Sequence, residues 1–453
     1  MTDFVQVPAD AAGKRINAST HNDGVNDIST QIFHLGDRHL PDQHQSVNNE
    51  GAAKVTFAEG SPDFDAFGRT TMSEPNLMAM YKFYHRDYGE EFEKNEVGGG
   101  TVVRDVAIKS MKLVCGTASG DKAEYHSHRH FHYRPGNSMA LTWTMRMGDS
   151  GKTNVTRWAG WRTDVDGIYL EAVESQIYVV IQNGNTGGEE RVAIQDWNGD
   201  RLDGSSGGNN LSQATLNPLM VGIWWIDFQF LGAGAVRLGT YVNGNKVVCH
   251  TIGHYGVVDR PYLSSPALSF AFGQENTGLT GSTSEMYVTC AVITNDGYDE
   301  FDRRPVSISG VKTITTTTAV PILSFRPTAT FHGVDNRARI LPQIVSVLAD
   351  GGAIEIIATA NPILTGDTWA DSVSGTEYDT NATALSGGEI KSSSFVANGR
   401  SESIDLSTIF KINIDGVTSH YTPTTSDHIT ISARLLSVGS ATAAVSLNVI
   451  EIE

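Results

Sequence analysis

Short apolar runs that alternate with polar residues recur along most of the chain. Between residues 157 and 183, the run RWAGWRTDVDGIYLEAVESQIYVVIQN places apolar side chains close to every second position from Ile168 onward. A period of two is what a strand with one buried face requires. The Asp166-Gly167 pair inside this run is a turn signal. We interpret the run as the folding centre of an antiparallel β-sandwich and not as an active site.

Similar runs fill residues 76–304, the expected main β-sandwich domain. In IDFQFLGAGAVRLGTYVNGNKVVCH, Asn243-Gly244 lies between alternating apolar runs and predicts a hairpin, because both residues tolerate positive φ. Many short strands at this spacing predict a sandwich or jelly roll. The expected strands are residues 102–108, 112–115, 125–133, 139–147, 168–171, 177–181, 221–231, 236–242, 246–251, 268–272 and 286–294.

The pattern changes on both sides of this region. Residues 1–75 are polar with scattered apolar positions, so we expect an extended N-terminal docking arm, with a disordered tail as the alternative. Residues 305–319, next to a charge cluster and rich in Thr, are expected to be a linker. Residues 320–453 carry further strand-like runs. The predicted fold class is therefore all-β, with two antiparallel β-sandwich, jelly-roll-like domains and an extended N-terminal arm.

The amino-acid composition makes some classes of binding partner unfavourable. The chain has 453 residues and a formal net charge of −18, which disfavours contact with nucleic acid or anionic membranes. No apolar run approaches the roughly 18 residues that a membrane span needs. The start of the chain lacks the basic and apolar regions of a signal peptide. The three cysteines, Cys115, Cys249 and Cys290, are far apart and are expected to be free thiols. We expect no nucleic-acid partner and no membrane insertion.

One segment, YHSHRHFHY, concentrates histidine. His126, His128, His130 and His132 fall at every second position, so on a strand all four would project from one face. Neutral imidazoles are good ligands for zinc, nickel or iron. Same-face residues lie roughly 6.5–7 Å apart, so one strand cannot surround an ion alone. The row could hold a structural metal ion with help from another strand or chain, or it could be a solvent- or interface-facing surface. No other cofactor is expected.

Aromatic residues supply a second group of candidates. Trp224 and Trp225 are adjacent, so on a strand one points into the core and the other outward. An outward Trp is a candidate for a protein interface or a sugar platform, although core packing is the common role of such residues. We predict four binding or interface residues: Trp224, Trp225, Tyr125 and Tyr133.

Known catalytic motifs are missing from the sequence. It contains no Gly-x-Ser-x-Gly, no phosphate-binding Gly-Lys-Ser/Thr loop and no His-Glu-x-x-His. Asp164-x-Asp166-Gly167 resembles a fragment of a calcium loop, but the twelfth position is Ser175 where an EF-hand needs Glu. We interpret it as a hairpin turn. We expect the protein not to be an enzyme, although carboxylate pairs for glycoside hydrolysis cannot be identified by spacing.

Several segments resemble structural proteins of tailed-phage virions. They are FDAFGRTTMSEP, YHSHRHFHYRPGNS, RWAGWRTDVDGIYLEAVESQIYVVIQN and WWIDFQFLGAGAVRLGTYVNGNKVVCH, followed by LPQIVSVLADGGAIEIIATANPILTGDTW in the C-terminal part. Together they span roughly residues 60–453. That group comprises tail, fibre and baseplate-associated proteins, and the resemblance implies no catalytic residues.

The resemblance implies a non-enzymatic subunit of the tail, baseplate or fibre apparatus that acts by self-association and by docking to neighbouring virion proteins. It implies a virion location, with assembly in the cytoplasm of the host bacterium. Its partners would be other virion proteins and copies of itself. Two alternatives remain: a capsid decoration or head-fibre protein, and a carbohydrate-binding module that recognises a host surface glycan.

Overall fold

The computed structural model describes residues 4–5, 16–22, 27–32, 75–89, 91–206, 209–296, 303–328, 330–331, 334–336, 339–372, 375–407, 414–415 and 428–452. Apart from one 3-10 turn, η1 (Ile194–Asp196), the regular elements in these ranges are β-strands. None of the helical residues described there forms a segment long and apolar enough to cross a membrane. The predicted all-β fold class is confirmed.

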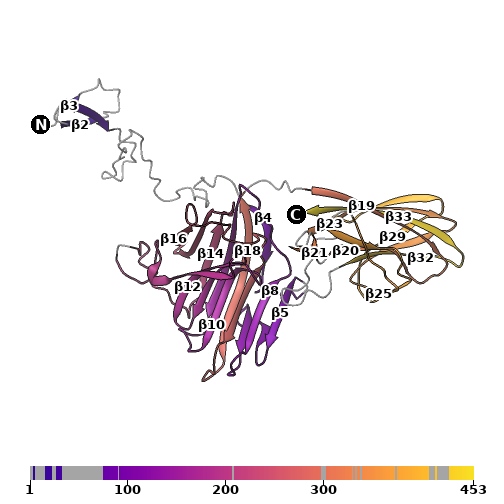
Figure 1. The fold of residues 1–453 in the computed structure, drawn as a ribbon, viewed down its shortest axis with the longest axis horizontal. Helices are drawn as coiled ribbons and strands as arrows, with labels where there is room; N and C mark the ends of the chain where they lie inside the picture. Colours follow the sequence, from indigo (N-terminus) through magenta and orange to yellow (C-terminus); the bar gives the residue numbers. More distant parts are fainter. Residues whose placement is uncertain are drawn as a thin grey trace. The chain divides into compact units, whose positions relative to one another are not determined.

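Seven antiparallel strands form one layer of the main sandwich (Figure 1). In spatial order the strands are β13 (Gly188–Ala193), β12 (Gln176–Asn183), β11 (Gly167–Val173), β10 (Val155–Arg162), β17 (Phe270–Asn276), β8 (Lys122–Ser127) and β5 (Phe92–Val97). The strands predicted at residues 168–171 and 177–181 are present as β11 and β12, and β10, which was not among the expected strands, precedes them.

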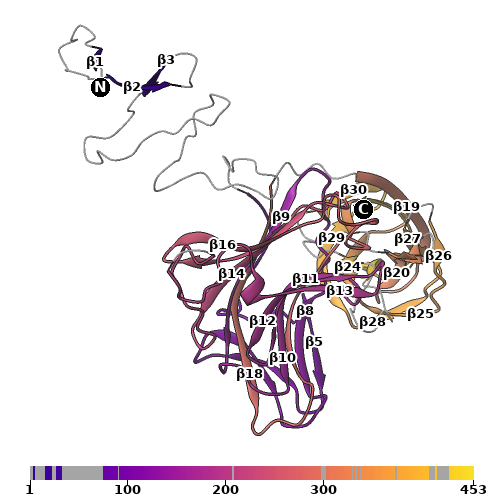
Figure 2. The same cartoon turned by 60° about the vertical axis from the view of Figure 1, so that its left-hand side comes forward.

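The second layer is an eight-stranded sheet that includes β14, β16 and β18 (Figure 2). The long strand β18 pairs with β9 on one side and with both β7 and β4 on the other. The strands are β16 (Asn245–Gly253), β15 (Ala235–Val242), β14 (Gly222–Phe228), β9 (Ser138–Met147), β18 (Ser284–Asp296), β7 (Ser110–Cys115), β6 (Thr101–Asp105) and β4 (Asn76–Tyr81).

A single apolar core lies between these two layers. Strand β9 illustrates how the sequence builds it, since alternate residues from Met139 to Met147 are buried while those between them are partly exposed. The opposite layer contributes Ala159, Trp161 and Ile168 among others. Each large side chain removed from water in this way stabilises the fold by about 1.5–3 kcal/mol before entropy is considered. The two-residue period therefore determines which face of each strand is inside.

Two turns show how local sequence directs the strands. Asn243 and Gly244 both have positive φ, 51° and 84°, and join β15 to β16 in the predicted hairpin. Asp166 lies in the turn between β10 and β11 and is buried. Its carboxylate accepts backbone N–H bonds from Gly184 at 3.0 Å, Ser264 at 2.7 Å and Ser265 at 3.0 Å. The carboxylate thus ties neighbouring loops together, as expected of a turn residue.

The C-terminal region forms a second sandwich with its own buried cluster, which includes Ile308, Phe325, Ile356 and Leu447. One sheet contains β19 (Arg303–Ile314), β33 (Ala441–Ile452), β23 (Arg339–Asp350), β30 (Arg400–Asp405) and β31 (Ile414–Asp415). The other contains β26 (Ala370–Asp371), β27 (Thr376–Asp379), β20 (Val320–Pro327), β32 (Ile429–Leu435), β24 (Ile354–Ala360) and β29 (Glu389–Val396). Two short pairs are β21 (Thr330–Phe331) with β22 (Val334–Asp335), and β25 (Ile363–Thr365) with β28 (Ala384–Ser386).

The prediction of a linker at residues 305–319 was wrong for most of its length. Strand β19 covers residues 303–314 and pairs with β33 from end to end. Ile308 and Ile314 are buried in the C-terminal core, whereas Val311 on the other face is 70% exposed. The Pro and Thr residues that suggested a linker are compatible with an edge strand, where Pro305 loses no essential ladder bond and β-branched Thr favours extended backbone.

Most of the arm predicted for residues 1–75 lies outside the described residues. Three strands within it are described, β1 (Phe4–Val5), β2 (Ile16–Asn22) and β3 (Asp27–Ile32), and they form an antiparallel sheet. Strand structure in this segment was expected only as short additions to something else. The docking role and the domain boundaries remain predictions.

Candidate functional site

The His row does not share one strand face, contrary to the prediction. Strand β8 ends at Ser127, so His126 lies on the strand while His128, His130 and His132 follow it in irregular backbone. Nearby, Phe131 forms an isolated bridge with Leu268. His126 is fully buried, and its Nε2 lies 3.4 Å from a carboxylate oxygen of Glu93. Within the described ranges, no three His, Cys, Asp or Glu residues are grouped as ligands for a metal. Metal binding stays a prediction.

The four aromatic residues predicted to bind a partner are buried. Tyr125 donates a 2.5 Å hydrogen bond to Asp87, and Tyr133 stacks on Phe228. Trp224 points into the core and Trp225 outward, as their adjacency required, yet both are at most 3% exposed. Lys246, whose ammonium lies 4.4 Å from the ring centre, covers Trp225. None of the four offers an open ring face to solvent, because charged or apolar neighbours cover them.

A different surface gathers polar and aromatic groups, on the outward side of the seven-stranded sheet. Strand register places Tyr178 opposite Glu171, Glu171 opposite Trp158, and Trp158 opposite Gly273, which in turn lies opposite Glu124. These residues therefore form one row across five strands. We call this surface the Trp158 face; it comprises Lys122, Glu124, Trp158, Arg162, Tyr169, Glu171, Tyr178, Glu189 and Arg191.

Trp158 lies at the middle of this face. A Cβ on Gly273 would come within 2.4 Å of its ring, so the glycine makes room for the indole. The indole Nε1 donates to the fully buried carboxylate of Glu124 at 3.1 Å. The Arg162 guanidinium lies 4.5 Å from the ring centre, within cation–π range. Lys122 completes the set, with its ammonium 2.9 Å from Glu124, and so offsets the cost of burying that charge.

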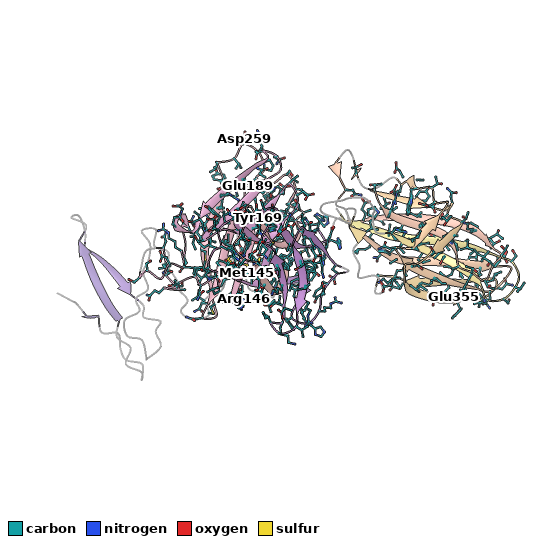
Figure 3. The ribbon with its side chains drawn as sticks, turned by 90° about the horizontal axis from the view of Figure 1, so that it is seen from below. Met145, Arg146, Tyr169, Glu189, Asp259 and Glu355 are labelled. Carbon is teal, nitrogen blue, oxygen red and sulfur yellow. The ribbon has the colours of Figure 1, made fainter. Side chains whose placement is uncertain are left out.

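A second group includes Tyr169 and Glu189 (Figure 3), and the Tyr169 ring centre lies 5.2 Å from the Arg162 guanidinium of the first group. The Tyr169 hydroxyl donates to Glu189 at 3.5 Å, and Arg191 bridges Glu189, at 3.0 Å, and Glu171. Burial raises the pKa of Glu171 above its ordinary value, although the Arg191 guanidinium works against this shift. Burial likewise raises the pKa of Tyr169. The hydroxyl therefore stays protonated and available as a donor at neutral pH.

The charges of the Trp158 face balance. Three cations, Lys122, Arg162 and Arg191, stand among three carboxylates, Glu124, Glu171 and Glu189. Arg191 and Glu189 are each 40% exposed, whereas Glu171, which pairs with Arg191, and Glu124, which pairs with Lys122 and Arg162, are buried. The accessible groups are thus planar guanidinium donors and carboxylate acceptors beside the half-buried ring of Tyr178. Such a surface can exchange hydrogen bonds with an uncharged polar ligand.

The outward side of the eight-stranded sheet carries a comparable but smaller cluster. Trp225 lies over Gly239, where a Cβ would meet its ring at 2.2 Å, and Arg237 lies 5.8 Å from the ring centre. Arg237 and Lys246 both pair with the buried Asp227. As on the Trp158 face, ion pairs engage the cations of this cluster, but here one carboxylate pairs with both of them. The cluster provides a matched comparison for the Trp158 face.

Comparison with known proteins identifies no family: no family model matches the chain, and no curated protein is similar to it. Solved structures with partial similarity include one from a study entitled "Prominent members of the human gut microbiota express endo-acting O-glycanases to initiate mucin breakdown" (13% identity, TM-score 0.34, 49% of this chain and 100% of that chain). The carbohydrate recognition domain of Emp47p gives 12% identity and a TM-score of 0.31, over 49% of this chain and 94% of that one. A β-1,3-glucanase from Mycobacterium marinum gives 11% and 0.31, over 49% and 100%. At these TM-scores the similarities assign neither ligand nor activity to this chain.

Proposed function

We propose that this protein is a carbohydrate-binding module whose site is the Trp158 face, and that its ligand is an uncharged surface glycan. The observation that carries the proposal is the row of Tyr178, Glu171, Trp158 and Glu124 across the outward side of the sheet, flanked by Arg162 and Arg191. Sugars present hydroxyl groups around a partly apolar ring. They therefore suit a surface that combines planar hydrogen-bonding side chains with aromatic rings.

The buried members of the face have a positioning role. Trp158 and Glu124 hold Arg162 from below, through a ring contact at 4.5 Å and an ion pair at 3.7 Å. Glu171 holds Arg191, which also lies 5.6 Å from the Tyr178 ring centre. The ligand would then meet Arg162, Arg191, Glu189 and Tyr178. Pre-positioned donors lose less side-chain freedom on binding, which favours affinity.

The balanced charge directs the choice of ligand. A polyanionic polymer would meet Glu189 and, within the protein as a whole, a net charge of −18. A polycation would meet Arg162 and Arg191. A neutral glycan incurs neither penalty, because a like-charge juxtaposition is what suppresses binding of a wrong partner.

The test is a glycan array of neutral and anionic bacterial surface glycans, followed by calorimetry on the ligands that bind. Tyr178→Ala and Arg162→Ala should each weaken binding by about tenfold or more, equivalent to roughly 1.4 kcal/mol. Tyr241→Ala and Arg237→Ala are the matched controls, since they remove the same residue types from the outward side of the other sheet. An array without any bound glycan, or equal losses in the controls, would contradict the proposal.

A second candidate function is that of a tail, baseplate or fibre subunit, which the sequence resemblance suggests and which is compatible with glycan recognition. The observation that favours it is strand β29, which ends its sheet and carries Ile390 and Phe395, each 65% exposed among the described residues. An apolar edge strand is a template for pairing with another chain. Light scattering of the purified chain should show an oligomer that Phe395→Lys dissociates. A monomer at all concentrations, missing from purified virions, would exclude this role.

A further inference from the structure

A cavity of about 330 Å³ lies at one end of the eight-stranded sheet. Its lining residues are different from those of the Trp158 face and belong to other strands. The cavity is partly open to solvent and is lined by strands β9, β14 and β15, by Leu202 and by residues 214–218 and 220–221. Its buried wall consists of Met145, Met147, Leu202 and Trp224. Met145 lies beside Arg146 on β9 (Figure 3). The size is at the lower end of the range of small-molecule sites.

Backbone hydrogen bonds hold the cavity open in the free protein. The Met147 N–H donates to the Pro218 carbonyl at 3.0 Å, and the Leu216 N–H donates to the Leu202 carbonyl at 2.7 Å. The first bond fixes Pro218 against β9, and the second ties Leu216 to Leu202, so that the two parts of the lining segment are held together. A ligand would therefore meet a preformed site and would not have to order it.

The polar groups around the cavity are already engaged by the protein itself. Thr240 donates its hydroxyl to the Ile223 carbonyl at 2.7 Å, and the Asn217 side chain accepts the Leu219 N–H at 3.1 Å. Arg146 is the charged residue among those described around the cavity, but it alternates on β9 with the core-facing Met145 and Met147, so its side chain lies on the other face of the strand, 4.2 Å from the ring centre of Tyr287. A charged ligand would thus lose its hydration without gaining a counter-ion.

We infer that this cavity is a binding site for a small, uncharged and largely apolar molecule of about the size of one or two fused rings. Apolar cavities of even about 150 Å³ take up benzene because water gains few hydrogen bonds inside them. Methionine side chains adapt to differently shaped ligands and make favourable contacts with aromatic rings. Met145, Met147 and the exposed rim residue Met220 supply such contacts here. The site is independent of the glycan proposal, since it uses the opposite sheet.

The experiment titrates the full chain with indole as a neutral probe and with indole-3-acetate as its charged counterpart, by calorimetry and ligand-observed NMR. Indole should bind saturably with a Kd of about 1 mM or tighter. Indole-3-acetate should bind at least about tenfold more weakly because the walls offer no free cation. No saturable indole binding, or equal affinity for both probes, would overturn the inference.

Two substitutions test whether indole binds in this cavity. Ala214→Leu adds three carbons to a residue that lines the cavity and should weaken indole binding by about tenfold or more through loss of space. Leu211→Ala changes an 86% exposed residue of the same segment and should leave the Kd unchanged. If Ala214→Leu prevents folding, Met145→Ala enlarges the cavity and should favour a larger probe, naphthalene, over indole. Unchanged selectivity in a folded variant would place indole elsewhere and overturn the inference.

Discussion

Burial disfavours ionisation of the Glu171 carboxyl on the Trp158 face. Burial raises its pKa above the ordinary value of 4.5, with Arg191 opposing the shift. Below that ordinary value the carboxyl is protonated in both folded and unfolded chains, so no penalty arises. As pH rises through the raised pKa, the folded protein loses stability relative to the unfolded chain. Glu171→Gln removes this loss. The difference in Tm between Glu171→Gln and the parent should therefore increase from about pH 4 to about pH 7, as measured by thermal denaturation.

The control for this prediction is Glu189→Gln, which removes the same charge from a neighbouring carboxyl that is 40% exposed. Because Glu189 keeps much of its hydration, its replacement reports the general effect of net charge. The two Tm differences should therefore depend differently on pH. Parallel curves would show that burial of Glu171 has no special effect on its ionisation.

At the scale of elements, alternation predicted strands well wherever one face was apolar and the other polar. Strands β11 and β12 and the Asn243-Gly244 hairpin follow from local sequence. The structure of the His-rich segment did not follow in this way, because His continues to recur at every second position beyond Ser127 while the strand stops there. A chain can leave a sheet without changing its polarity pattern, since long-range contacts such as Phe131 with Leu268 decide where pairing ends.

The Trp158 face could be predicted only in part from the sequence. Trp158, Gly160 and Arg162 alternate with the core residues Ala159 and Trp161, so their outward direction was readable from the period of two. The residues beside Trp158 could not be predicted in this way. Glu124 and Gly273 come from distant segments and lie next to Trp158 only because of the strand order. Strand order depends on non-local pairing, which no single stretch specifies. Residues 157–183, which we interpreted from the sequence only as a folding centre, thus also have an outward face with polar side chains.

Strand β19 allows a direct test of whether residues 305–319 belong to the C-terminal sandwich. Ile308→Ala removes a buried side chain from the C-terminal core and should cost about 2–4 kcal/mol of unfolding free energy. Val311→Ala, on the same strand but 70% exposed, should change it by less than about 0.5 kcal/mol. Chemical denaturation followed by circular dichroism measures both. If residues 305–319 acted as a linker, the two substitutions would be equally silent.

At the scale of the whole molecule, the described residues form two large buried apolar clusters, one from Tyr81 to Ile293 and the other from Ile308 to Val449, besides a small one of Trp158, Tyr169 and Val180 on the Trp158 face. Each of the two large clusters lies between its own pair of sheets, so loss of one core need not expose the other. Calorimetry should therefore show two unfolding transitions, and Ile308→Ala should lower only one of them. A ligand that binds the Trp158 face, or the cavity lined by Met145, binds the first sandwich. By mass action it should therefore raise only the temperature at which the first sandwich unfolds. One transition that responds to both the substitution and the ligand would mean that the two cores unfold as a single cooperative unit.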